Sequence, residues 1–486
     1  MNYTPLHNHL HTSIGDSIGR PEDAIDRAKK LGMDTLALTD HGNMFGFVEF
    51  YELCKKNDIR PILGMEIYVA PQHSSIKTPE NRKNYHAVLL AKNNQGLKNL
   101  IKICSISNSE QSFYYKPRLS LEEIAPYSEG LICLTACIQS ELCVTLFQND
   151  TFKVATLHKD KNEVEKLLVS NWEEVLLNNI SKYRAIFKDD LYLEIQKAGM
   201  AIQDVYIDCM RFAAKETGIP IVATCDSHFP NPEDAIEQEL IVLIDKKITM
   251  EEKANMIDGD MDGTFRDHSQ YYIRTYDEMK QYFTEEELEN TNVVASKCSV
   301  TLDLGNIYLP KFICPDGQNS KEFLTKLCNE RFCEPKVPSD KQDVYRKRME
   351  YELEVINNAG LADYFLIVWD ICNFCDTEGI YRGPGRGSVA GSIVAYILGI
   401  TSVDSIKYDL PFERFFNSGR WTETRKKLPD IDTDFEKTRR KDVISYISKK
   451  YGSDKVAHIS NLNTMKLKAA IRDVFRVLNI EGDRQK

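Results

Sequence analysis

Short apolar segments alternate with longer amphipathic segments through the first half of the chain. The apolar segments are rich in β-branched and other apolar residues and have the length of strands. Helical patterns fit between most of them, as at 21–31, where a proline stands in the expected first turn. About seven β/α units in roughly 230 residues predict a barrel-like or doubly wound α/β domain. The predicted strands are 5–10, 35–39, 62–69, 87–91, 131–135, 191–195 and 220–224.

The strand–helix alternation stops at about 248–270. Segment 255–263 is rich in Gly, Asp and Met and is predicted to be a loop or linker. A second region begins near Tyr271 and contains a long helical pattern at 339–358, followed by a glycine-rich turn. Within the first region, the charged helical segment 151–179 is predicted to be a surface insertion.

Composition excludes several classes of protein. With 62 Lys and Arg against 73 Asp and Glu, the net charge is −11, which argues against nucleic-acid binding by overall positive charge but leaves room for a local basic groove. The longest apolar stretches, such as 392–400, are far shorter than the roughly 20 residues of a membrane-spanning helix. No signal peptide is recognisable, and the 13 cysteines are interpreted as reduced thiols. A cytoplasmic protein with no membrane partner is expected.

Candidate metal ligands follow the predicted strands. His7, His9 and His11 alternate on the first strand and would share one face. In a β/α barrel the functional groups gather at one end of the strands. Imidazole, carboxylate and thiolate are ligands of zinc or manganese, and several carboxylates favour a multi-metal site that activates water against a phosphate ester. Among the later strands, the second ends at Asp40 and His41, the third carries Glu66, the fourth opens with His86, the fifth ends at Cys137 and the seventh ends at Asp226 and His228.

A glycine-rich segment in the second region has the character of a phosphate-binding loop. Segment 381–388 precedes an apolar helical run at 389–398, whose N-terminus would offer free N–H groups to an anion. Arg382 and Arg386 add donors suited to phosphate. By itself such a segment is equally well explained as a simple turn.

Alternating carboxylates follow about forty residues later. Asp430, Asp432 and Asp434 alternate with Ile431 and Thr433, so on a strand the three carboxylates would share a face. Such clustering is unfavourable without cations and is how Mg²⁺ ions are held for phosphoryl transfer. The alternative is a solvated acidic strand edge, although alternating Asp is poor strand composition.

These segments resemble the alpha subunit of bacterial DNA polymerase III, the family C replicative polymerases. The most specific matches are RGPGRGSVAGS at 382–392, FERFFN at 412–417 and PDIDTDF at 429–435, in family order and at near-family spacing. AAIRDV at 469–474 continues the resemblance. The similarity covers nearly the whole chain apart from 151–179.

The resemblance implies a fold, an activity and a set of domains. It implies a PHP (polymerase and histidinol phosphatase) domain over 1–270, built as a distorted (β/α)7 barrel. An incomplete palm of the polymerase-beta nucleotidyltransferase type would span 271–463, and the start of a helical thumb would span 464–486. The activity implied is template-dependent DNA synthesis, with DNA primer–template and deoxynucleoside triphosphates as partners. The PHP site is a candidate 3′–5′ proofreading exonuclease.

The resemblance also implies functional residues in both domains. In the palm, Asp430 and Asp432 would be catalytic and hold Mg²⁺, with Asp434 less certain. Gly387 and Ser388 resemble the palm's Gly-Ser signature. The residues expected near the incoming triphosphate are Arg382, Arg386 and Arg414. The PHP ligands of Zn²⁺ or Mn²⁺ would be His9, His11, Asp16, His41, Glu66, His86, Cys137, Asp226 and His228.

Two departures from the family pattern affect the functional reading. A basic insertion at 418–427 is interpreted as an exposed loop rather than a DNA contact. The sequence stops inside the thumb-like region, before the family's third palm carboxylate and its fingers, so a complementary C-terminal chain is expected to be needed. The alternatives are a stand-alone metal-dependent phosphoesterase and a non-catalytic assembly scaffold.

Overall fold

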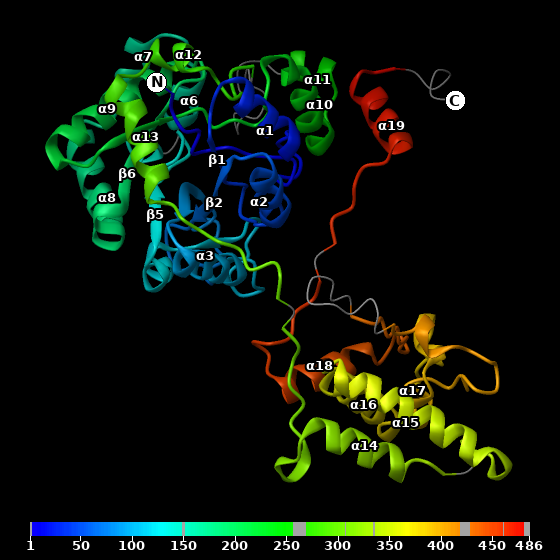
Figure 1. Ribbon diagram of the computed structural model, residues 1–486. Coiled ribbons are helices and arrows are strands. Elements are labelled where there is room, and N and C mark those ends of the chain that lie inside the picture. The colour runs from blue at the N-terminus through cyan, green and yellow to red at the C-terminus, as the bar shows by residue number, and fades with distance from the viewer. Residues whose placement is uncertain are drawn as a thin grey trace. The chain divides into compact units, whose positions relative to one another are not determined.

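The computed structural model describes residues 2–147, 151–255, 269–306, 308–333, 336–417, 428–459 and 461–480. The chain divides into two compact units, unit 1 (Met1–Leu302 with Thr464–Lys486) and unit 2 (Asp303–Asn463). The predicted linker at 255–263 and the basic insertion at 418–427 lie outside the described residues, except for the backbone of Asn255. Figure 1 shows the elements of both units.

Unit 1 is built on one curled sheet. Its strand order is β1-β2-β3-β5-β6-β7, with β4 paired to β2. Most pairs are parallel, but β3 runs antiparallel to both β2 and β5. The strands are β1 Thr35–Leu38, β2 Arg60–Val69, β3 Tyr85–Ala91, β4 Arg118–Leu119, β5 Leu131–Leu134, β6 Leu191–Gln196 and β7 Ile221–Thr224.

The segment before the first helix joins the two outer strands of this sheet. The N–H of Thr39 donates to Asn8 O on one side, and the N–H of His9 donates to Ser227 O on the other. This segment was predicted as a strand at 5–10, but it makes only an isolated bridge at Asn8. The Asn8 amide donates to Pro5 O, three residues away, and to Ala37 O beside β1, in place of regular ladder bonds. The other predicted strands are present, and β4 is too short for a sequence pattern to reveal it.

Helices surround the sheet of unit 1 (Figure 1), and the buried apolar side chains form one large cluster and a second, smaller one that includes Leu6, Ile62 and Val222. The segment 151–179, predicted as a surface insertion, contributes Ala155, Val164 and Leu176 to that core, because its helices pack against α9. The helices are α1 Pro21–Lys30, α2 Phe47–Lys56, α3 Asn94–Ser107, α4 Leu121–Ile124, α5 Glu141–Val144, α6 Thr151–Leu157, α7 Lys161–Glu165, α8 Trp172–Phe187, α9 Ala201–Thr217, α10 Ala235–Lys246, α11 Met250–Asn255, α12 Tyr276–Lys280, α13 Glu285–Lys297 and α19 Leu467–Val477.

Unit 2 is helical in its described residues and has its own apolar core, which includes Phe365, Ile393 and Phe412. Its helices are α14 Ser320–Glu330, α15 Gln342–Asn358, α16 Ala362–Thr377, α17 Ile393–Leu398 and α18 Arg440–Tyr451. Two short 3₁₀ helices, η6 Gly387–Gly391 and η7 Phe412–Arg414, belong to the glycine-rich and FERFFN segments. Together the two units confirm the α/β fold class.

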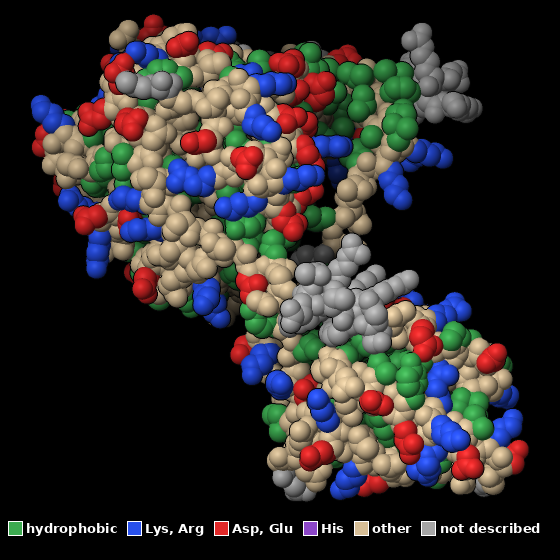
Figure 2. All heavy atoms as spheres, in the orientation of Figure 1, with side chains coloured by type: hydrophobic (Ala, Val, Ile, Leu, Met, Phe, Trp, Pro, Cys, Tyr) green, Lys and Arg blue, Asp and Glu red, His purple; other side chains and the backbone are tan. Residues whose placement is uncertain are grey.

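Across the described residues no single helix is both long and apolar enough to cross a membrane. Only the pair Ser339–Asn358 and Ala362–Thr377, bent by 116°, satisfies those criteria when its two helices are taken together. Figure 2 shows Lys and Arg side chains interspersed with Asp and Glu on the visible face of unit 1, without a large patch of one sign.

Candidate functional site

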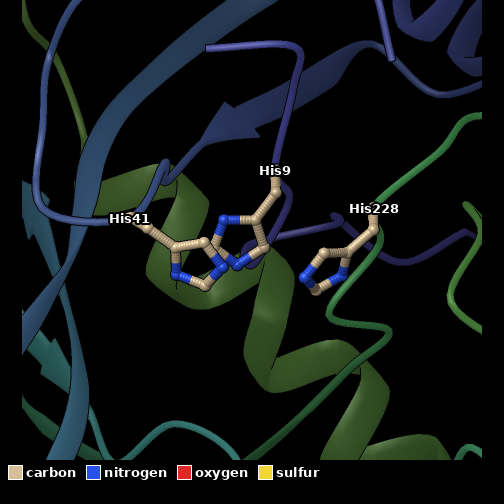
Figure 3. Close-up of side chains that lie close together, drawn as sticks. All are labelled: His9, His41 and His228. Carbon is tan, nitrogen blue, oxygen red and sulfur yellow. The ribbon is translucent and has the colours of Figure 1, made fainter. Parts of the chain in front are cut away.

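Imidazole and carboxylate side chains converge inside the sheet of unit 1. His7 and His9 come from the segment that joins β1 to β7, His41 follows β1 and His228 follows β7. Glu66 lies on β2. Figure 3 shows His9, His41 and His228 with their rings turned toward one another from three separate parts of the chain. The His9 ring centroid lies 3.9 Å from that of His41 and 4.6 Å from that of His228.

The ligand-type atoms of this cluster form overlapping groups. Three sets have their nitrogen, oxygen or sulfur atoms all within 4.8 Å of one another. Asp226 Oδ1 joins two of the sets, because it lies 3.2 Å from the Nε2 atoms of both His7 and His9. Asp16 Oδ2 lies 2.8 Å from His41 Nε2 and 3.4 Å from His228 Nε2. The sets are His9, His41, His228; His7, His9, Glu66; and Glu66, His86, Cys137.

Burial and neighbouring charges shift the pKa values in this cluster strongly. Burial favours neutral His7, but the Asp226 and Glu194 carboxylates outweigh burial and raise the pKa of His7 to about 10. Burial together with the charges of His41 and His228 lowers the pKa of His9 to about 3. Burial raises the pKa of the Cys137 thiol, and the Glu66 carboxylate adds to that effect. The site therefore concentrates charge where water does not screen it.

Several buried acceptor atoms in the cluster lack a hydrogen bond. Within the described residues, His41 Nδ1, Glu66 Oε2 and Asp226 Oδ1 have no hydrogen-bond partner, although Glu66 Oε2 lies in ion-pair contact with His41 Nδ1, and Asp226 Oδ1 lies 3.2 Å from the Nε2 atoms of His7 and His9. A buried carboxylate with unpaired oxygens is costly unless a cation faces it. Lone pairs from imidazole and carboxylate directed at a common point are the donor set of Zn²⁺ and Mn²⁺. The residues present therefore fit a bound metal ion.

A second site lies in unit 2, where the glycine-rich segment meets the acidic segment. The two segments pair antiparallel, since the N–H of Gly383 donates to Asp434 O and the N–H of Arg386 donates to Asp432 O. They form isolated bridges rather than a strand. Gly387 has φ +82°, a backbone conformation that favours glycine, and it lies directly beside the Asp432 carboxylate.

The Arg386 guanidinium occupies the space between the carboxylates. Its Nε lies 3.1 Å from Asp434 Oδ2 and its Nη1 lies 3.3 Å from Asp432 Oδ2. The hydrogen bond to Asp434, together with the charges of Asp432 and Asp430, raises the pKa of Arg386. All three carboxylates therefore act on one guanidinium, in the position that a cation bound to them would take.

The helix N-terminus expected to bind phosphate is already occupied. The helix α17 begins at Ile393, later than predicted, and its first N–H groups donate to the side chain of Glu352. Ser392 accepts from the N–H of Ala395 and donates to Glu352. A buried carboxylate thus takes the place of an anionic ligand, and the expectation of free N–H groups at this helix is wrong.

The other predicted triphosphate contacts differ in their surroundings. Arg382 donates two hydrogen bonds of 2.8 Å to Asp376 and a third to Gly399 O. Its guanidinium is therefore already hydrogen-bonded within unit 2. Arg414 lies exposed on η7. Gly387 and Ser388 begin η6 beside Asp432, with Gly387 exposed and Ser388 half-buried. The structure brings Arg386, Gly387 and the acidic segment together, and directs Arg382 elsewhere.

Family models match both regions of the chain. The PHP domain model matches residues 5–198, and the model described as the bacterial DNA polymerase III alpha NTPase domain matches residues 322–486. The DNA polymerase III subunit alpha of Borreliella burgdorferi is 38% identical over 491 residues, covering 98% of this chain and 39% of the relative. The Helicobacter pylori and Aquifex aeolicus subunits are each 36% identical, with 98% of this chain covered and 39% and 40% of the relatives.

The chain belongs to the bacterial DNA polymerase III alpha family. It spans about two fifths of the length of the curated relatives that it matches. Among solved structures, an amidohydrolase from Chromobacterium violaceum aligns with 47% of this chain and 88% of its own, at 14% identity and a TM-score of 0.27.

In the PHP domain, the structure places eight of the nine predicted ligands around the cluster and leaves one out. His11 is exposed and belongs to none of the ligand groups found among the described residues. His7 lies in the cluster instead and is fully buried. The regular alternation assumed for 5–10 does not persist to His11, because the chain turns after Leu10, where Ser13 N–H donates to Leu10 O.

Sequence reasoning missed two PHP-domain residues that hold His7. Glu194 Oε1 lies 2.7 Å from His7 Nδ1, and Gln196 donates to the same oxygen at 2.9 Å. Both side chains come from β6 and are buried. A carboxylate inside an otherwise apolar strand was the available signal, since a buried charge requires a partner.

Proposed function

We propose that this chain is the N-terminal part of a DNA-directed DNA polymerase III alpha subunit, which extends a DNA primer on its template with deoxynucleoside triphosphates. The observation that carries the proposal is the pairing of the glycine-rich segment with the acidic segment, which sets Arg386 beside Asp432 and Asp434. Nucleotidyl transfer needs carboxylates for metal ions and a guanidinium for phosphate at one place. The similarity to polymerase subunits over nearly the whole chain supports this assignment.

Each palm residue would have a separate role in nucleotidyl transfer. Asp430 and Asp432 would hold Mg²⁺, which when bound neutralises charge on the triphosphate. Arg386, released from the carboxylates, and Arg414 would bind phosphate oxygens, while Gly387 and Ser388 let the backbone approach closely. Arg382, which is hydrogen-bonded to Asp376, would instead stabilise the glycine-rich segment. A complementary C-terminal chain would carry the remaining palm, the thumb and the fingers.

The domain boundaries, the cellular location and the partners form part of the proposal. We assign the PHP domain to 1–270, the incomplete palm to 271–463 and the start of the thumb to 464–486. The compact units are divided differently, because α13 packs on β7 and α19 packs on α10 within unit 1. A cytoplasmic location without a membrane partner suits 13 cysteines that are all free.

A primer-extension experiment tests the polymerase proposal. The chain alone should not extend a primed template, because positioning of the attacking 3′-hydroxyl is worth roughly 7–11 kcal/mol and is expected to need a third carboxylate besides Asp430 and Asp432. Adding a polypeptide that corresponds to the remaining length of the relatives should restore extension, and Asp432→Ala should abolish it again. Extension by the chain alone, or by the reconstituted Asp432→Ala enzyme, would contradict the proposal.

A second function is favoured by the cluster in the PHP domain, namely metal-dependent hydrolysis of phosphate esters. Zn²⁺ or Mn²⁺ bound there would lower the pKa of a coordinated water and polarise the ester. Glu194 holds the His7 ring through Nδ1 and leaves Nε2 facing Asp226 and His9. The ligands we propose are His7, His9, Asp16, His41, Glu66, His86, Cys137, Asp226 and His228. This arrangement favours an active site over a non-catalytic scaffold.

Metal content and hydrolysis test the phosphoesterase. The purified chain should retain more than one transition-metal ion, His9→Ala should lose metal, and His11→Ala, a matched control outside the cluster, should keep it. Slow removal of nucleotides from a DNA 3′ end should disappear in Asp226→Asn while the circular dichroism stays unchanged. Equal metal content in His9→Ala and His11→Ala would overturn the assignment, and degradation that persists in Asp226→Asn would indicate a contaminating nuclease.

A further inference from the structure

The metal cluster opens into a cavity with a basic and aromatic mouth. The cavity has a volume of about 810 Å³, and His41, Glu66, Asp226 and His228 lie in its wall. That volume is within the range of pockets that enclose one small ligand, so a polymer could insert only its end. The rest of the polymer must then lie across the mouth of the cavity.

Positive side chains are concentrated at this mouth although the chain as a whole has a net charge of −11. The five cationic residues of the cavity wall are exposed, and none forms an ion pair with a carboxylate within the described part of the chain. Cations without a carboxylate partner attract a polyanion more than they stabilise the fold. They are Arg82, Lys83, Lys116, Lys153 and Lys246.

One aromatic ring is presented among these cations. Tyr115 is 62% exposed, and its φ of +62° is a backbone conformation that bulky residues rarely adopt. It forms the tip of a tight turn in which the N–H of Tyr114 donates to Lys116 O. The Arg82 guanidinium lies 4.5 Å from the Tyr115 ring centroid. An exposed aromatic ring with an Arg against it is a stacking platform for a nucleic-acid base.

A buried arginine holds in place the two loops that carry this platform. Arg118 is fully buried and donates to Ile76 O at 3.0 Å and to Asn81 O, which ties the loop bearing Arg82 to the turn bearing Tyr115. Its guanidinium also lies 4.8 Å from the Tyr114 ring centroid. A pre-organised pair of loops loses little freedom when a ligand binds.

We propose that the mouth formed by Arg82, Tyr115 and Lys116 binds a single-stranded polynucleotide whose terminal phosphodiester enters the metal cluster. This inference rests on the proposed phosphoesterase and adds the residues outside its metal cluster that would hold the strand. Tyr115 stacks on a base next to the terminal one, and Arg82 and Lys116 bind the neighbouring phosphates. The 810 Å³ cavity receives the terminal nucleotide.

Binding without metal tests the surface directly. A fluorescein-labelled 12-mer of deoxythymidine is titrated with the full chain in EDTA and followed by anisotropy. Tyr115→Ala should weaken binding about fivefold or more, as expected for the loss of one stacked base, and Tyr115→Phe should restore it. Arg82→Ala should also lower the slope of log K against log salt by about 0.7, the value for one phosphate contact on a single strand.

A matched control and a site-specific readout complete the test. Lys55→Ala removes a cation that lies 5.6 Å from the Tyr51 ring centroid on α2, outside the cavity wall, and should leave binding unchanged. A strand containing 5-iododeoxyuridine should cross-link to Tyr115 under ultraviolet light. Binding equal to the parent chain in Tyr115→Ala and Arg82→Ala, or cross-links confined to unit 2, would overturn the proposal.

Hydrolysis separates this inference from the proposed function. In the Mn²⁺-loaded chain, Tyr115→Ala should raise KM for an oligonucleotide at unchanged kcat and leave hydrolysis of bis(p-nitrophenyl) phosphate unaffected. Oligonucleotide binding that depends on Tyr115 without hydrolysis of either substrate would support the surface and refute the phosphoesterase. Hydrolysis of both substrates with no effect of Tyr115→Ala would support the phosphoesterase and refute the surface.

Discussion

At the scale of the residue, the Arg386 guanidinium lies between two carboxylates of the acidic segment. The guanidinium balances carboxylates that would otherwise repel one another, and it lies within 3.3 Å of oxygens on both Asp432 and Asp434. A metal ion and Arg386 cannot occupy that position together. Metal binding at the palm should therefore release the guanidinium toward the phosphate.

We predict that Arg386→Ala tightens Mn²⁺ binding at the palm. One nearby positive charge in a water-exposed site weakens the binding free energy of a cation by about 1 kcal/mol. Its removal should therefore raise the affinity for Mn²⁺ roughly fivefold. The measurement is a Mn²⁺ titration in a His9→Ala background, which removes the cluster in the PHP domain. Arg439→Ala is the matched control, because Arg439 pairs with Asp442 instead. Unchanged or weaker Mn²⁺ binding in Arg386→Ala would contradict this account.

At the scale of the element, α17 owes its position to a residue on a different helix. Glu352 on α15 is fully buried and accepts from the N–H groups of Ile393 and Val394. Arg348 donates to Glu352 and also to Gly391 O and Leu410 O, which joins η6 to the segment before η7. The glycine-rich segment is therefore shaped by Arg348 and the buried Glu352, and their contacts to residues 391–410 are ones that no local pattern reveals.

Glu352→Ala should destabilise unit 2 by about 3 kcal/mol, because buried N–H groups without a partner cost about 1–3 kcal/mol each. Ser392→Ala, which removes only the N-cap of the same helix, should cost about 1 kcal/mol. Urea unfolding followed by the fluorescence of Trp369 in unit 2 measures both. Equal losses in the two variants would show that Glu352 does not fix this helix.

The loop beside the cavity mouth is anchored by a carboxylate whose state depends on pH. Glu123 accepts from the Ser74 and Ser120 N–H groups and from the Ser74 hydroxyl. Burial alone would raise the pKa of Glu123, but these hydrogen bonds outweigh burial and lower it below the ordinary value of 4.5. Glu123 therefore stabilises the fold above the unfolded pKa, and this contribution is lost as the pH falls through the folded pKa.

The predicted consequence is a pH-dependent anchor for the loop. Between pH 7 and about 5 the loop should be protected from hydrogen exchange, and below about pH 4.5 the protection should fall. Glu123→Gln should show reduced protection at every pH, because the amide keeps one acceptor but loses the charge. Exchange measured at Ser74 and Ser120 over this range is the test, and identical profiles in the two proteins would refute the anchor.

At the scale of the whole molecule, each compact unit has its own apolar core and its own site. The ligand cluster belongs to the core of unit 1, and the acidic segment belongs to unit 2. Variants that remove one site without opening a core should leave the other site intact.

We therefore predict that the two proposed activities can be separated. In the reconstituted polymerase, Asp432→Ala should abolish primer extension and retain the metal content and phosphodiesterase activity of the PHP domain. His9→Ala should lose metal and phosphodiesterase activity and still extend the primer. Primer extension and metal analysis on the same preparations decide this, and loss of both activities in either variant would contradict independence.

The sequence alone indicated which strands carry the candidate ligands and which residues make up most of the two candidate sites. Their positions on or beside the strands predicted that Glu66, His86 and Asp226 gather in one site, because functional groups of a β/α barrel collect at one end of the sheet regardless of the intervening chain. The alternation of Asp430, Asp432 and Asp434 likewise placed them together, because backbone extension is a local property.

Only the tertiary structure decided which of the three early histidines enters the cluster and which donors are already used. His7 rather than His11 is buried there, because the Asn8 amide and the turn after Leu10 end the regular alternation. Glu352 fills the N-terminus of α17 from forty-one residues away in sequence. Both outcomes depend on hydrogen bonds between distant segments, which a pattern of neighbouring residues does not contain.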